Sequence, residues 1–230
     1  MLNGDWILML KIKDTGFVLS LKRHSENAFI LTVLTKNNGK FCGLLRGKKA
    51  PLIGSFVSVS WQARLAEHLG TFAYEDILPL SSFYMEDKKR LACLSCLAAL
   101  LNALLPEREA IPDFYRNLEL FTQTLSDDDW LKNYIFLELE LLKVIGFGLD
   151  FRSCAGGGDK NDLAYVSPKT GRAVSREKGL PYHDKLLPLP AFLWKETSAT
   201  TADFKQALSL IGFFLAQHTK ELPIMREKML

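Results

Sequence analysis

A stretch without acidic residues, at 35–51, carries the side chains of this chain that are best suited to binding a phosphate backbone. Its five basic residues are Lys36, Lys40, Arg46, Lys48 and Lys49. An Asn-Asn-Gly run predicts a turn, because Asn and Gly tolerate positive φ, and residues 40–45 predict a short strand ended by Gly47. The expected structure is a hairpin with basic side chains at both ends, where flexible glycine lets a polyanion approach closely. A solvated basic turn is the alternative.

The charge is divided unevenly along the chain. The 230 residues have a formal net charge of +3, but residues 1–65 hold ten Lys and Arg against three Asp and Glu, a net charge of +7. The remaining residues hold nineteen Lys and Arg against twenty-three Asp and Glu, a net charge of −4. This asymmetry predicts a basic binding module joined to a more neutral body. The 48% apolar and 24% charged content is typical of a globular protein.

Groups that could carry out catalysis are not clustered. The chain has no phosphate-binding loop ending in Gly-Lys-Ser/Thr, no dinucleotide-binding glycine pattern after a strand, and no nucleophile elbow. The histidines, at positions 24, 68, 183 and 218, are isolated from one another. Glu138 and Glu140 are two residues apart in a predicted helix and therefore point to different faces. We predict that the protein is not an enzyme and uses no cofactor.

The four cysteines, at positions 42, 93, 96 and 154, are too few and too scattered for a disulfide framework. Cys93 and Cys96 lie in an apolar helical pattern that predicts buried thiols, and Cys154 has no second cysteine at zinc-ligand spacing. We expect no metal site, and a reducing cytoplasm as the location. The apolar run at 6–10 is too short for a signal peptide or a membrane span.

The first 80 residues have the pattern of a small β-barrel. Strands are predicted where apolar and polar residues alternate or where β-branched residues gather, between Gly, Asn and Pro. Five short strands in about eighty residues favour a closed barrel, and the five-stranded OB barrel, which binds nucleic acids, is one candidate. The predicted strands span residues 16–22, 28–34, 40–45, 56–62 and 69–80.

From residue 81 the apolar period changes from two to 3.6, which predicts helices. The fold class is therefore α+β, with a barrel domain at 1–80 and a helical domain at 81–230. An irregular insertion at about 150–190 contains short strands at 163–166 and 172–175. Residues 1–8 precede the first pattern, and Met9 is an alternative start that would make them a non-native extension. Helices are predicted at 87–105, from Pro112, at 130–145 and after Thr200 or Thr201.

Several stretches, taken in order, resemble one family of bacterial proteins, and they extend over nearly the whole chain from about residue 11. No single stretch is specific, but their order and spacing are. They are Gly-Phe-Val-Leu at 16–19, Arg-His-Ser-Glu at 23–26, Arg-Gly-Lys-Lys at 46–49, Leu-Leu-Pro-Glu at 104–107, the leucine-rich 138–142, Leu-Asp at 149–150 before Cys154, 162–168, and Leu-Pro-Leu-Pro at 187–190. The chain resembles the DNA repair and recombination mediator RecO.

The resemblance implies an N-terminal OB barrel and a helical second domain. It implies binding of single- and double-stranded DNA, annealing of complementary strands, and a cytoplasmic, nucleoid-associated protein. Its implied partners are RecR, with which it helps to load recombinase, and single-strand binding protein (SSB), whose acidic, Phe-ended tail enters a pocket of the helical domain. It implies no membrane partner.

The resemblance and the charge distribution together assign the expected binding residues. The DNA contacts would neutralise phosphates without reading bases, and they are Lys36, Lys40, Arg46, Lys48 and Lys49, with Lys22, Arg23 and Arg64 in reserve. The tail pocket would lie along residues 139–151, with Leu139, Leu142, Lys132, Lys143 and Arg152 as candidates.

The sequence departs from the family pattern in two places. His24 and Ser25 replace the usual Tyr-Gly, and only Cys154 remains where some members have four zinc-binding cysteines, so the resemblance implies no metal here. Two other functions stay open. The chain could be an adaptor whose basic barrel binds acidic proteins, or an unrecognised nuclease or phosphoesterase, although acidic residues are scarce in the basic half.

Overall fold

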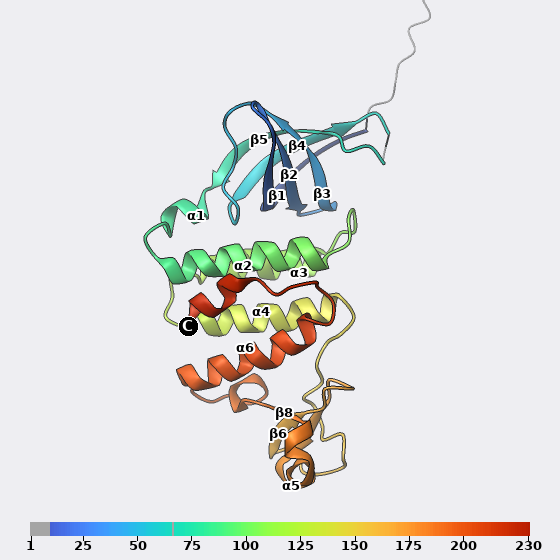
Figure 1. Ribbon diagram of the computed structural model, residues 1–230, viewed down its shortest axis with the longest axis vertical. Coiled ribbons are helices and arrows are strands. Elements are labelled where there is room, and N and C mark those ends of the chain that lie inside the picture. The colour runs from blue at the N-terminus through green and yellow to red at the C-terminus, as the bar shows by residue number, and fades with distance from the viewer. Residues whose placement is uncertain (1–9, 66) are drawn as a thin grey trace, which may run out of the picture. The chain divides into compact units, whose positions relative to one another are not determined.

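The structure, a computed structural model, describes residues 10–65 and 67–230, and its N-terminal part is a five-stranded closed barrel (Figure 1). The strand order around the barrel is β1-β2-β3-β5-β4, as in an OB-type barrel. The predicted α+β class is therefore confirmed. The possible extension at 1–8 and the alternative start at Met9 lie outside the described residues. The strands are β1 (Leu10–Ser25), β2 (Ala28–Thr35), β3 (Gly39–Arg46), β4 (Phe56–Ala63) and β5 (Thr71–Leu78).

The barrel closes because β1 is long enough to pair with two neighbouring strands. Its first half pairs with β4 and its second half with β2, and the change of partner falls at Gly16 and Phe17. A Cβ atom at Gly16 would lie 2.3 Å from the Val33 side chain, so only glycine fits where the strands cross. The alternating apolar residues that predicted the strands form the core, in which Trp61 and Val33 are almost completely buried.

The closure between β3 and β5 is short. Only Leu44 with Thr71 and Leu45 with Phe72 pair across it, in parallel. After Arg46 the chain turns away at Gly47, whose φ of +123° favours glycine. From Ala73 onward β5 is paired with β4 alone. One edge of β5 is therefore open beside the loop that follows β3.

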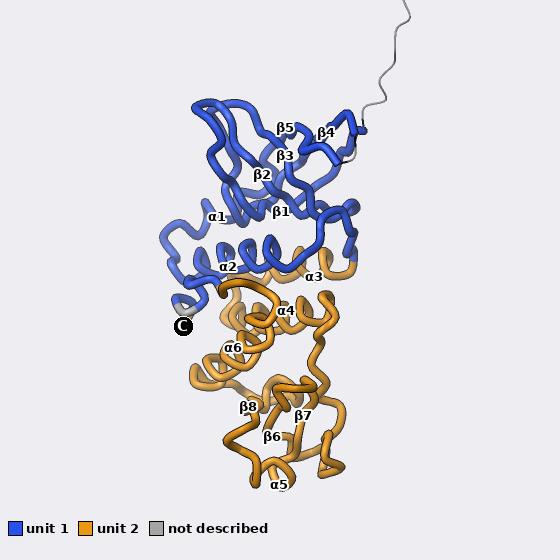
Figure 2. Tube along the Cα trace, turned by 45° about the vertical axis from the view of Figure 1, so that its right-hand side comes forward, with its two compact units in different colours: residues 1–112, 223–229 blue, residues 113–222, 230 orange. Residues whose placement is uncertain are grey.

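The first compact unit of the chain combines the barrel with two helices and the C-terminal turn (Figure 2). It comprises residues 1–112 and 223–229. Asp87 caps α2 by accepting hydrogen bonds from the Lys89 and Arg90 amides. The elements outside the barrel are α1 (Leu80–Phe83), α2 (Lys88–Leu104), which packs against β1, and η3 (Ile224–Met229), which packs against α2.

The second unit, residues 113–222 and 230, is built on helices that the 3.6 period predicted. A capping box at Thr200 and Asp203 starts α6, as expected for one of the two threonines. The domain boundary predicted at residue 80 stays a prediction. The long helices are α3 (Pro112–Gln123), α4 (Trp130–Val144) and α6 (Thr201–Leu215), and α4 packs on α6.

Between α4 and α6 lies the insertion, a three-stranded sheet in the order β7-β6-β8 with short helical turns. The strands predicted at 163–166 and 172–175 match β6 and β7 closely. No helix within residues 10–65 and 67–230 has the length and apolar content needed to cross a membrane. The elements are β6 (Leu163–Val166), β7 (Ala173–Ser175), α5 (Arg176–Gly179), η1 (Leu180–Lys185), β8 (Leu187–Pro188) and η2 (Ala191–Leu193).

Candidate nucleic-acid interface

A groove of about 510 Å³ opens on the barrel where β3 and β5 separate. One wall is the end of β3 and the loop after it, and the other is the open edge of β5. The groove gathers three of the five basic residues predicted from the hairpin. Its lining is Leu45, Arg46, Gly47, Lys48, Lys49, Phe72, Ala73, Tyr74, Glu75 and Asp76.

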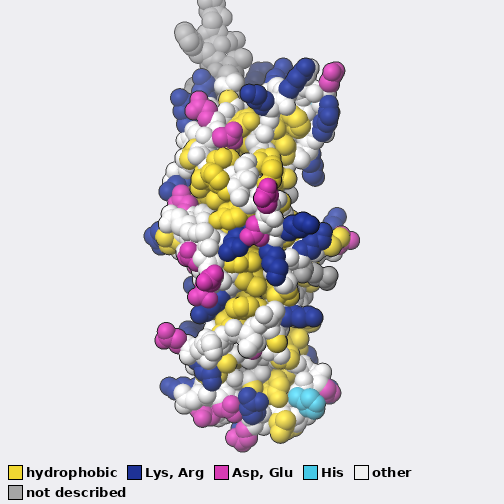
Figure 3. Space-filling model, turned by 90° about the vertical axis from the view of Figure 1, so that its left-hand side faces the viewer, with side chains coloured by type: hydrophobic (Ala, Val, Ile, Leu, Met, Phe, Trp, Pro, Cys, Tyr) yellow, Lys and Arg dark blue, Asp and Glu magenta, His cyan; other side chains and the backbone are white. Residues whose placement is uncertain are grey.

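The basic wall is fixed by the strand pairing. Arg46 is the last residue of β3 and lies opposite Ala28 of β2. The Gly47 amide donates to the Asn27 carbonyl at 2.9 Å and anchors the loop to the turn between β1 and β2. Arg46, Lys48 and Lys49 are all exposed, and Figure 3 shows Lys and Arg side chains gathered over the barrel at the top of the view. Three exposed cations on an anchored loop can neutralise consecutive phosphates.

The β5 wall supplies aromatic surface. Phe72 is buried in the barrel core, whereas Tyr74 is half-buried and packs against the core with part of its ring free to line the groove. Burial, together with the nearby charge of Asp76, raises the pKa of Tyr74. The sequence did not single out Tyr74, because its alternation with Phe72 looks like ordinary core packing. The groove forms at the point where β3 turns away from β5, which the sequence pattern does not show.

Lys36 lies at the other end of the hairpin, separate from the groove. Thr35 pairs with Gly39 at that end and Ala28 with Arg46 at the groove end, so the two ends are about 25 Å apart at strand spacing. The turn beside Lys36 is held by Asp14, which accepts hydrogen bonds from the Asn37 amide at 2.8 Å and from the Asn37 and Asn38 side chains. The basic hairpin is therefore two basic sites and not one.

Lys40 is buried, and its position removes it from the candidate DNA surface. It is 9% exposed, and its ammonium donates to the Asn102 carbonyl, at the end of α2, at 2.8 Å. Burial lowers the pKa of Lys40, and the charge of Glu107 acts against this. The unfolded chain holds this proton more tightly, so the contribution of Lys40 to stability rises as pH increases toward the ordinary pKa of 10.5.

Removing the ammonium of Lys40 should leave DNA binding unchanged. We expect Lys40→Met to bind a single-stranded oligonucleotide within about twofold of the wild type, while Lys48→Met weakens binding roughly fivefold by deleting one phosphate contact. Fluorescence anisotropy at low salt measures both affinities. Equal losses in the two variants would contradict the assignment of Lys40 to the interior.

The reserve residues do not line the groove. Lys22 and Arg23 lie on β1 opposite Ile30 and Phe29, and the Arg23 guanidinium donates to the carbonyl of Ser25, within its own turn. Arg64 is exposed beyond the end of β4. All three are surface cations that could extend a phosphate path, but the groove itself is built from the loop after β3.

A second cavity, of about 680 Å³, lies in the second unit beside the C-terminal half of α4. It brings together three of the five predicted partner-binding residues, Leu139, Lys143 and Arg152. Phe136 adds aromatic surface that the sequence interpretation missed, and Phe151 adds more at the end of the predicted range 139–151. Phe136, Leu139 and Lys143 follow the i, i+3, i+7 spacing of one helix face, a signal that could have identified Phe136. The lining is Phe136, Leu139, Glu140, Lys143, Gly148, Leu149, Asp150, Phe151, Arg152 and Leu193.

The other two predicted residues lie elsewhere. Leu142 is fully buried on the opposite face of α4, beside Glu138, so it packs in the core and does not border the cavity. Lys132 precedes Phe136 by one turn on the exposed face but does not line the cavity. The predicted set thus divides into cavity, core and surface residues.

The basic edge of this cavity includes an ion pair. The Arg152 guanidinium donates to both Asp150 carboxylate oxygens, at 2.8 and 3.2 Å. Hydrogen bonds from the Arg152 side chain and amide lower the pKa of Asp150 to about 2. Because this carboxylate stays ionised at neutral pH, it offsets the charge of Arg152, and Lys143 is the more available cation for an anionic ligand.

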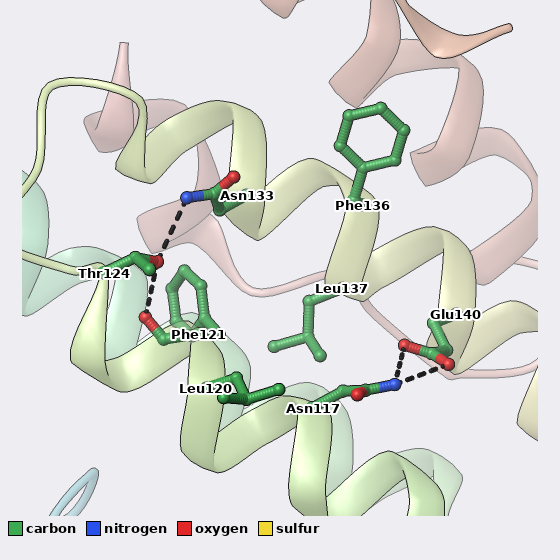
Figure 4. A pocket seen from close by; sticks show the side chains of 8 residues that line it. All are labelled: Asn117, Leu120, Phe121, Thr124, Asn133, Phe136, Leu137 and Glu140. Carbon is green, nitrogen blue, oxygen red and sulfur yellow. Dashed lines mark hydrogen bonds between the residues drawn. The ribbon is translucent and has the colours of Figure 1, made fainter.

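A smaller pocket of about 260 Å³ lies between α3 and α4 and shares Phe136 and Glu140 with the larger cavity. Figure 4 shows Asn117 donating to the Glu140 carboxylate and Asn133 donating to Thr124, with Leu120, Phe121 and Leu137 between them. The amide and carboxylate groups of this pocket already satisfy one another, which leaves it mainly apolar.

Among the residues that the structure describes, no three His, Cys, Asp or Glu side chains lie close enough together to hold a metal ion. The Cys154 thiol is buried and accepts a hydrogen bond from the Ser175 amide at 3.2 Å. Hydrogen bonds from Ser175 and from the amides of Gly156 and Gly158 outweigh burial and lower the pKa of Cys154.

Family models match both parts of the chain. The chain matches the family model described as Recombination protein O N terminal over residues 9–78, and the one described as Recombination protein O C terminal over residues 85–227. These ranges contain the barrel groove and the α4 cavity, respectively.

Curated relatives cover most of the chain. It is 41% identical over 213 residues to the DNA repair protein RecO of Rhodospirillum centenum, a match that covers 89% of this chain and 85% of the relative. It is 42% identical over 218 residues to that of Mesorhizobium japonicum, covering 91% and 86%, and 40% identical over 215 residues to that of Rickettsia canadensis, covering 91% and 89%. As the order of its sequence motifs predicted, the chain belongs to the RecO family.

Proposed function

We propose that this protein is a DNA repair and recombination mediator whose barrel groove binds the DNA backbone. The observation that carries the proposal is the gathering of Arg46, Lys48 and Lys49 on one wall of an open groove. Membership of a family whose named members are DNA repair proteins supports it. Neutralising phosphates on two strands lowers their repulsion, so complementary strands can anneal without any catalytic residue.

The salt dependence of binding tests this proposal. Three phosphate contacts predict that log K for a single-stranded oligonucleotide falls with log salt at a slope of about −2, at about −0.7 per contact. We expect annealing of complementary strands to accelerate over the same salt range in which binding is observed. Failure to bind DNA at low salt, or binding that is insensitive to salt, would overturn the proposal.

We further propose that the α4 cavity receives the acidic, Phe-ended tail of SSB. Its aromatic and aliphatic walls fit a terminal phenylalanine, and Lys143 and Arg152 at its edge fit a carboxylate. The action with RecR in loading recombinase follows from the resemblance alone.

Reversing the charge of Lys143 should weaken tail binding. We expect Lys143→Glu to lower the affinity for a fluorescent peptide with an acidic, Phe-ended tail by at least about tenfold. The change places a carboxylate against the peptide carboxylate. Lys132→Glu, with the same charge change on the same helix but outside the cavity, serves as the control and should bind within about twofold of the wild type. Equal effects of the two changes would indicate general electrostatics and not a cavity.

A further inference from the structure

The barrel groove has walls of opposite charge. Arg46, Lys48 and Lys49 form one wall, while Glu75 and Asp76 belong to the other. Two exposed carboxylates would weaken a surface that only attracted a phosphate backbone. Their presence in the same groove points to a ligand that brings hydrogen-bond donors as well as negative charge.

Strand geometry separates the two acids. Successive side chains of a strand alternate between faces, so Tyr74 and Asp76 share one face of β5 while Glu75 points from the other. The effect of the Asp76 charge on the pKa of Tyr74 agrees with this closeness. Tyr74 is held against the barrel core, which gives the groove a fixed aromatic surface next to a carboxylate.

We propose that the groove holds one unpaired nucleotide whose base is read by Asp76. This inference rests on the proposed DNA binding and extends it. The phosphate lies at the basic wall, the base lies against Tyr74, and an exocyclic amine of the base donates to the Asp76 carboxylate. A groove of about 510 Å³ is within the usual size of small-ligand sites, and base–aromatic stacking is tolerant of sequence.

The arrangement discriminates between the two pyrimidines. At the exocyclic 4-position, cytosine presents an N4 amine that donates to a carboxylate, whereas thymine presents the O4 carbonyl, which a carboxylate repels. Thymine would have to shift along the Tyr74 ring to bring its N3–H group to Asp76. A base paired in a duplex cannot lie flat against Tyr74, so the preference applies to single strands only. Because one nucleotide per groove is read, the remainder of a bound strand is held without regard to sequence.

Homopolymers test the inference without knowledge of the binding register. Oligo(dC) and oligo(dT) of about 12 nucleotides, within the site size of one OB barrel, are titrated at weakly basic pH, where cytosine is unprotonated. We expect the wild type to bind oligo(dC) roughly tenfold more tightly than oligo(dT), as one charge-assisted hydrogen bond predicts.

Two isosteric variants test whether the Asp76 carboxylate causes the preference for oligo(dC). Asp76→Asn should bind both homopolymers alike, because an amide can accept from cytosine or donate to thymine. Glu67→Gln makes the same charge change at an exposed residue outside the groove and should keep the tenfold preference. Equal binding of the homopolymers by the wild type, or a preference that survives in Asp76→Asn, would overturn the inference while leaving phosphate binding intact. Absence of binding to either homopolymer would overturn the proposed DNA binding itself.

Discussion

Charge reversal of the basic wall, as Arg46→Glu, Lys48→Glu and Lys49→Glu combined, should weaken binding of single-stranded DNA by at least about a hundredfold at low salt. Three favourable phosphate contacts become repulsive, and the salt slope of about −2 should approach zero. The three side chains are exposed and line one groove, so the barrel should stay folded. Anisotropy titrations at several salt concentrations measure both quantities.

The control for this prediction carries the same charge change elsewhere. Lys160, Lys169 and Lys185 are exposed residues of the insertion, and their combined replacement by Glu changes the net charge equally. We expect that variant to lose only the small affinity due to overall charge and to keep its salt slope. If both triple variants lose binding alike, the groove is not the DNA site, and net charge governs the interaction.

Truncating the buried carboxylate of α4, as Glu138→Ala, should lower the free energy of unfolding by about 3 kcal/mol. Glu138 is fully buried and accepts a hydrogen bond from the Tyr134 hydroxyl at 2.5 Å. Alanine removes the acceptor, leaves a cavity, and takes away a partner of a buried hydroxyl. Urea titration followed by circular dichroism measures the change.

Two further variants separate the causes. Glu138→Gln keeps the shape and an acceptor, so it should cost only about 1 kcal/mol. Glu140→Ala, in the same helix, removes a partly exposed carboxylate bonded to Asn117 and should also cost no more than about 1 kcal/mol. A Glu138→Ala protein as stable as Glu140→Ala would show that the buried carboxylate contributes nothing to the fold.

The sequence predicted most of the strands and helices because their side-chain periods reflect local geometry, but it missed residues 10–15, the part of β1 that pairs only with β4. It could not predict the position of Lys40. The residue lies in a strand, and its pattern does not reveal that the end of α2, some sixty residues later, covers that side of the strand and offers the Asn102 carbonyl. Burial of this kind comes from packing between distant segments, which a local pattern does not contain.

The α4 cavity gives the opposite lesson. Helical spacing alone separates Leu142, which shares the buried face with Glu138 and Ile135, from the half-buried Leu139. That distinction was within reach of the sequence. The aromatic wall of the barrel groove was not, because Tyr74 becomes a surface residue only where the parallel pairing of β3 and β5 ends.

The segment after α2 determines where the chain can be truncated without exposing the barrel. The Arg108 amide donates to the Lys40 carbonyl, its guanidinium lies 5.4 Å and 5.3 Å from the Phe41 and Trp61 rings, and its φ is +61°. A fragment ending near residue 80 would lack this segment and would expose apolar barrel surface. An isolated barrel suited to spectroscopy should therefore extend through residue 112, so that it includes its closing segment, and it also needs residues 223–229, because η3 packs against α2.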